Sequence, residues 1–110
     1  LDAFEQLLLA NSGHPDKGSE LKVDFIAAGL DDVVASASLE QFAAPDDVKW
    51  FASFAKAFIN TPSCGEAMDA TGIADATRRE SWNTKLDEWT SDPAAYFAMA
   101  WGEAVGRVAA

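Results

Sequence analysis

The side chains most able to perform covalent or acid–base chemistry are scarce in this sequence: one histidine, His14, and one cysteine, Cys64. Nucleophilic catalysis needs a base beside the nucleophile, and a metal site needs several ligands in a defined geometry. A Cys–His pair would require only that these two residues meet, but no neighbouring residue supports that role. A lone loop histidine is usually solvated, and a free cysteine is more often a small buried residue. We therefore expect no catalytic residue, no metal site and no cofactor, and we rank an enzyme third among the functions considered, after an interaction protein and a pocket protein.

Carboxylates and glycines, the other chemically informative residues, fit structural roles. Carboxylate pairs occur at Asp31-Asp32, Asp46-Asp47 and Asp87-Glu88. Helix starts and solvated helix faces account for all three pairs. The seven glycines are scattered and open no phosphate-binding loop, and no stretch resembles a calcium-binding loop. These residues add no candidate catalytic or metal site.

The charge balance excludes two classes of partner. Eight basic residues oppose eighteen acidic ones, which gives a net charge of -10. Nucleic acids would be repelled, because their binding depends on Lys and Arg neutralising phosphates. An anionic membrane surface is disfavoured for the same reason. The charge instead favours solubility or a basic protein partner.

Four tryptophans, Trp50, Trp82, Trp89 and Trp101, are the strongest binding candidates in the 110 residues. Core packing is their simplest use. Because tryptophan is enriched at interfaces, they are also candidates for a protein–protein contact or for the walls of an apolar ligand pocket. The elements that carry them decide between these uses.

The central element is predicted to be a helix over residues 46–60, which starts at Pro45 with two acids in its first turn. Its apolar residues form one face, Val48, Phe51, Ala52, Ala55, Phe58 and Ile59, with a second row at Trp50, Phe54 and Ala57. Its polar residues, Lys49, Ser53, Lys56 and Asn60, form one narrow stripe. A helix this apolar needs neighbours on at least two sides.

Further helices are predicted at residues 1–11, 19–30, 39–44, 63–69, 76–89 and from Pro93 to the end, with a helical turn at 31–34. Residues 21–26 are ambiguous, since Leu21, Val23 and Phe25 also alternate as in a strand. We favour a helix there because no second strand is evident nearby to pair with it.

The final predicted helix carries small residues at every fourth position: Ala94, Ala98, Gly102, Gly106 and Ala110. Glycine costs about 1 kcal/mol relative to alanine inside a helix. Two glycines at this spacing therefore indicate a ridge that packs closely, either within the chain or between two chains.

Together these patterns predict one all-α domain, residues 1–110: a compact bundle of five or six helices, several of them short, around the helix at 46–60. The function we expect is that of a non-enzymatic acidic protein acting through protein–protein interaction, with itself as a homodimer or with a basic partner. The alternative is a helical pocket protein that binds a small apolar ligand through Trp and Phe side chains. The single cysteine favours a cytoplasmic location, and no apolar run is long enough to span a bilayer.

Overall fold

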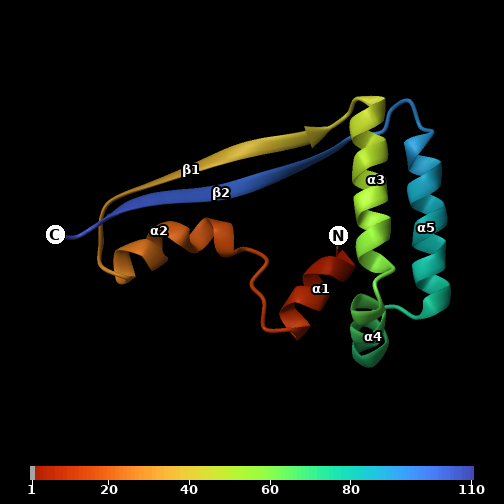
Figure 1. Ribbon diagram of the computed structural model, residues 1–110, viewed down its shortest axis with the longest axis horizontal. Helices are drawn as coiled ribbons and strands as arrows, with labels where there is room; N and C mark the ends of the chain where they lie inside the picture. Colours follow the sequence, from red (N-terminus) through yellow and green to blue (C-terminus); the bar gives the residue numbers. More distant parts are fainter. Residues whose placement is uncertain (1) are drawn as a thin grey trace. The chain divides into compact units, whose positions relative to one another are not determined.

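The computed structural model describes residues 2–110, which form five helices and two strands (Figure 1). In chain order these elements are α1 (Asp2–Ala10), α2 (Lys17–Ala27), β1 (Leu30–Phe42), α3 (Pro45–Ile59), α4 (Pro62–Thr71), α5 (Ala76–Thr90) and β2 (Phe97–Val108). The two strands form an antiparallel sheet, so the prediction of an all-α bundle is wrong. None of the described helices is long and apolar enough to cross a membrane.

The described residues group into two compact units. The helical unit comprises residues 2–13 and 41–97, and it contains α1, α3, α4 and α5. The ribbon unit comprises residues 14–40 and 98–110, and it contains α2 and almost all of both strands. The expectation of a single domain over residues 1–110 stays a prediction.

Helix α3 confirms the predicted central helix. Ala44 precedes it in an extended conformation, Pro45 occupies its first turn, and Asp46 and Asp47 follow as acids near its N-terminus. Val48 and Ala52 are buried on one face. Helix α5 runs antiparallel beside α3, and its start was also predicted: the Asp75 carboxylate accepts a hydrogen bond from the Arg78 backbone N–H at 2.8 Å.

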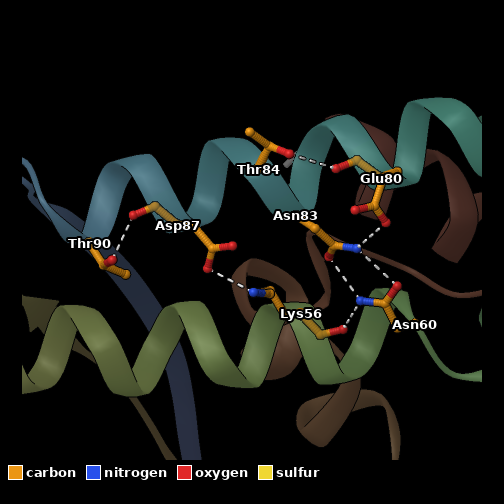
Figure 2. A network of polar contacts seen from close by, with 7 residues as sticks. All are labelled: Lys56, Asn60, Glu80, Asn83, Thr84, Asp87 and Thr90. Atoms are coloured by element: carbon orange, nitrogen blue, oxygen red, sulfur yellow. Dashed lines mark hydrogen bonds and ion pairs between the residues drawn. The ribbon is translucent and has the colours of Figure 1, made fainter.

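Polar residues line the seam between α3 and α5 (Figure 2). The Lys56 ammonium pairs with the Asp87 carboxylate at 2.7 Å, and the Asn60 and Asn83 amides exchange hydrogen bonds of 2.9 and 3.1 Å. Two members of the predicted polar stripe therefore face the neighbouring helix, while Lys49 and Ser53 are exposed. An exposed ion pair contributes little, typically below about 1 kcal/mol, so this seam fixes alignment more than stability.

The core of the helical unit forms between α1, α4 and the segment that follows α4. Its buried members are Leu7, Cys64, Met68 and Ala74. Helix α4 ends at Gly72, whose φ of 70° is the left-handed conformation that glycine adopts without strain. The Arg79 guanidinium donates to the Asp69 carboxylate and to the Ala74 carbonyl, each at 2.8 Å, and so ties α5 to the end of α4.

Helices α1 and α2 confirm two predictions. The predicted helix at residues 1–11 is α1, although Leu1 lies outside the described residues. The ambiguous segment at residues 21–26 lies inside α2, which confirms the preference for a helix.

The predicted turn at residues 31–34 and the predicted helix at 39–44 are wrong, because both segments lie largely in β1. The predicted final helix is wrong as well, because residues 97–108 form β2. Its apparent start is a turn instead: the Asp92 carboxylate accepts from the Ala94 N–H at 2.8 Å, and the Ala95 N–H donates to the Asp92 carbonyl at 3.0 Å. An Asp side chain caps such a turn as readily as it caps a helix.

Bulky and small side chains alternate along β2 with a period of two, and the four-residue repeat of small residues concealed this alternation. Bulky Phe97, Met99 and Trp101 alternate with Ala98 and other small residues. Because four is an even number, residues four apart share one face of a strand just as they share one face of a helix. The repeat of small residues was therefore compatible with both structures.

Candidate interaction surfaces

The four predicted tryptophans do not form one site. Trp50 and Trp101 are exposed, at 59% and 50%. Trp82 is half-buried against the core of the helical unit, and the Arg78 guanidinium lies 5.9 Å above its ring. Trp89 is half-buried and meets Phe51 edge-on, with ring centroids 6.1 Å apart. Trp82 and Trp89 thus pack within the helical unit, whereas Trp50 and Trp101 are exposed.

An aromatic cluster within the helical unit brings together the last residue of β1, the first residue of β2 and helix α3. Phe42, which is buried, stacks on Trp50 with centroids 5.8 Å apart and lies 4.9 Å from Phe51. Phe51 in turn lies 4.6 Å from Phe97. The last residue of β1 and the first of β2 are thereby fixed to α3, since such aromatic pairs add about 0.5–1.5 kcal/mol to ordinary burial.

Helix α3 also presents an exposed aromatic row: Trp50, Phe54 and Phe58, spaced four residues apart. Trp50 stacks on Phe54 with centroids 5.6 Å apart, and Phe4 of α1 meets Phe58 edge-on at 5.7 Å. These rings expose on the order of 400 Å² of apolar surface, which is the size of patch that often has a function. Trp50 and Phe54 belong to the predicted second apolar row of the central helix, whereas Phe58 was predicted on its first face, and the exposure of these three rings was not predicted.

The alternation along both strands gives the ribbon two different faces. One, the Trp101 face, is held by polar pairs. The Ser38 hydroxyl donates to the Glu103 carboxylate at 2.7 Å, and Ser36 donates to its other oxygen at 3.2 Å. The Trp101 indole N–H donates to the Glu40 carboxylate at 2.9 Å. Sequence reasoning missed these polar residues, although Val34, Ser36, Ser38 and Glu40 alternate in β1 with Val33, Ala35, Ala37 and Leu39.

The opposite face, the glycine face, contains Ala98, Ala100, Gly102, Ala104 and Gly106. A Cβ atom placed on Gly102 would lie 2.7 Å from the Gly18 Cα of α2, so the two backbones touch where both residues lack side chains. A Cβ atom on Gly106 would lie 3.1 Å from Leu30 Cβ. Of the predicted ridge, Gly102 and Gly106 thus have close neighbours, Ala98 is exposed, and Ala94 lies in the turn before β2.

The ribbon unit contains no fully buried residue within the described chain. Large apolar side chains are exposed on its helix and on both strands: Val23, Ile26, Val34, Leu39, Trp101, Val105 and Val108, with Leu39 at 80%. An isolated pair of strands is at best marginally stable in water, because it needs a third strand or a packed helix to cover its apolar side chains.

Both outer edges of the ribbon are also open. The sheet has two strands, so each strand has one hydrogen-bonded neighbour. Neither strand contains proline or lysine, which natural proteins commonly use to protect such edges. The edge of β1 is interrupted at Asp32, whose φ of 50° is left-handed, whereas β2 contains no residue with positive φ.

His14 and Cys64, the side chains most able to perform chemistry, lie in surroundings that are typical of structural residues. The exposed His14 lies 3.3 Å from the Glu20 carboxylate, and Cys64 is buried in the core of the helical unit. Burial raises the pKa of the Cys64 thiol, against a smaller opposite effect of the Arg79 guanidinium, so the reactive thiolate is disfavoured. Among residues 2–110, no group of three or more His, Cys, Asp or Glu side chains is arranged to hold a metal.

Two surface depressions of the helical unit also lack the features of an apolar pocket. One lies around Met68, Gly72 and Arg78, and the other lies between Ile59, Pro62 and Arg79. Neither is lined by a tryptophan or a phenylalanine. Comparison of the chain with models of protein families, with curated proteins and with solved structures found no match. The exposed surfaces are therefore the features of this chain from which a function can be inferred.

Proposed function

We propose that this is a non-enzymatic interaction protein whose ribbon unit binds another protein chain. The observation that carries the proposal is the absence of any buried residue among residues 14–40 and 98–110, all of which the structure describes. Ordering a residue costs roughly 1–2 kcal/mol in backbone entropy. Buried apolar surface is what normally offsets that cost, and the ribbon unit has little of it.

A protein partner fits this surface better than a small ligand does. The exposed apolar residues are spread along two strands and a helix rather than gathered in a hollow. Open strand edges offer unpaired backbone groups, which another strand can satisfy. A small apolar ligand would require a concave site lined by Trp or Phe, and neither depression of the helical unit has that lining. We also propose a cytoplasmic location, which the single unpaired cysteine favours.

The test is hydrogen exchange of the ribbon amides as a function of protein concentration, combined with native mass spectrometry. We expect amides of β1 and β2 to be protected in the assembled protein and to exchange rapidly on dilution, while those of α3 and α5 stay protected. A monomer in which the strands are protected as well as α3 at every concentration would overturn the proposal, because the ribbon would then need no partner.

A further inference from the structure

We infer that the partner is a second copy of this chain, and that two copies pair antiparallel along the outer edges of β2, with Val105 at the centre. This inference rests on the proposed function and names its partner. The ribbon offers two open edges, and the edge of β2 is the regular one, because its 12 residues contain no left-handed backbone. The left-handed Asp32 interrupts the edge of β1 close to the start of that strand.

The charges on β2 select the register. The strand carries two charged residues, Glu103 and Arg107, and both lie on the Trp101 face because their numbers have the same parity as Trp101. Arg107 is the only basic residue in either strand, and its side chain is 80% exposed. Among residues 2–110, it pairs only with the exposed Asp32 carboxylate, at 3.6 Å.

In an antiparallel pair related by a two-fold axis, residues equally distant from the central residue lie opposite each other. A centre at Val105 places Glu103 of each copy opposite Arg107 of the other, which gives two pairs of unlike charges. A centre at Glu103 would place two carboxylates opposite each other, and a centre at Arg107 would do the same with two guanidiniums. Like charges directly opposite are destabilising, so the register about Val105 is the complementary one.

This pairing also removes two features that destabilise the isolated ribbon: its small number of strands and the open edge of β2. It produces a four-stranded sheet in the order β1, β2, β2, β1, which exceeds the three strands that a stable sheet needs. It satisfies the open edge of β2 and places the exposed Val105 of one copy against its counterpart. Because the same edge is used by both copies, the contact closes on itself as a dimer.

A cysteine cross-link tests the register directly. Opposite residues in an antiparallel pair have Cα atoms about 4.5–5.5 Å apart, within the range that a disulfide spans. We expect Val105→Cys to form a covalent dimer under mild oxidation. The matched control is Val34→Cys, because Val34 is also an exposed valine of the Trp101 face, at 64% against 72% for Val105, but lies on β1. We expect that variant and the wild type, whose one cysteine is buried, to stay uncross-linked.

Charge variants provide a second measurement, read as the dimer dissociation constant in sedimentation equilibrium. We expect Glu103→Arg and Arg107→Glu each to weaken the dimer at least tenfold, and the double swap to recover most of that loss. Circular dichroism of each variant confirms that the fold is retained. An additive loss in the double swap would overturn the register about Val105.

The possible results separate this inference from the proposed function. A concentration-dependent dimer without a Val105→Cys cross-link would overturn the inference and leave the proposed function standing. Assembly with a different protein in place of a dimer would do the same. A monomer with a ribbon protected at every concentration would overturn both.

Discussion

The helical unit and the ribbon unit differ in where their side chains are buried. All the buried residues of the described chain lie in the helical unit: Leu7, Phe42, Val48, Ala52, Cys64, Met68, Ala74 and Ala95. The ribbon unit has none. A helix satisfies its backbone hydrogen bonds internally, so three or four packed helices close a core among themselves. A strand shares its hydrogen bonds with its neighbours, so a two-stranded ribbon ends in two unsatisfied edges.

The lesson of this comparison is that the two units gain their order from different sources. The helical unit is held by contacts inside the chain, such as the Met68 core and the α3–α5 seam in Figure 2. The ribbon unit depends on the pairing of its two strands, on the polar pairs of the Trp101 face, on the backbone contact of Gly18 with Gly102 and, in our proposal, on a second chain.

Met68→Ala should cause the largest loss of stability. Met68 is 2% exposed at the centre of the helical core, and removing such a side chain costs about 2–5 kcal/mol because it leaves a cavity. The free energy of unfolding in urea measures the effect. Leu9→Ala, at an exposed position of α1, is the control and should change the free energy of unfolding by much less. Equal losses in the two variants would show that the core is not where the structure places it.

Gly102→Leu should disrupt the ribbon unit while leaving the helical unit folded. The new side chain would meet the backbone of Gly18, which cannot move away as a flexible side chain can, and overpacking costs roughly 1–3 kcal/mol. Hydrogen exchange should show faster exchange in β2 with unchanged protection in α3. The control is Ala100→Leu, at an exposed position of the same glycine face. If both variants leave the exchange of β2 unchanged, the contact with Gly18 has no energetic role.

Asp75→Ala should produce a smaller, local effect in the helical unit. It removes the carboxylate that accepts from the Arg78 N–H, and the loss of such a cap typically costs about 1 kcal/mol. We expect faster amide exchange in the first turn of α5 and a lower urea midpoint. Asp75→Asn keeps an oxygen at the cap and should retain most of the stability; a loss as large as that of alanine would point to the charge instead.

The reactivity of the native thiol should distinguish the units without changing the fold. Cys64 is buried in the helical unit, so an aromatic disulfide reagent should modify it only as fast as that unit opens. A cysteine introduced at the exposed Val34 of β1, which lies outside the proposed dimer contact, should react within the mixing time of a manual experiment. Rapid reaction of the wild-type protein would contradict the burial of Cys64.

The same thiol gives a small pH dependence with a definite sign. Burial raises the pKa of folded Cys64 above that of the unfolded chain, so the folded state holds the proton more tightly. The resulting stability is complete below the ordinary thiol pKa and is lost as the pH rises through the folded value. We expect the urea midpoint to fall more steeply above about pH 8.5 in the wild type than in Cys64→Ala. Parallel pH profiles would show that the thiol is solvated.

The helices were predictable because their signals are local. The start of α3 at Pro45, the start of α5 near residue 76 and the first apolar face of α3 each depend on residues within one or two turns, and the structure confirms them.

The strands were not predictable in the same way. Strand β1 pairs with β2, which follows it in the chain only after three helices. No residue near β1 therefore indicates which segment pairs with it. Strand β2 contains Ala98, Ala100 and Ala104, and alanine has high helix propensity and is depleted in strands. Two signals were available: Phe97, Met99 and Trp101 alternate with small residues in β2, where the four-residue repeat concealed them, and Ser36, Ser38 and Glu40 alternate with apolar residues in β1. The polar pairs on the Trp101 face depend on that pairing and were missed with it.

The position of three helices between β1 and β2 has a consequence for synthesis of the chain on the ribosome. At roughly 5–20 residues per second, β1 emerges several seconds before β2 is available to pair with it. During that interval both edges of β1 are open, and its sequence contains no proline or lysine to discourage contact with other nascent chains. The helices that follow β1 can fold while it waits, and the ribbon is completed last. Newly made chains are therefore most vulnerable to aggregation at the stage when the helical unit has already formed.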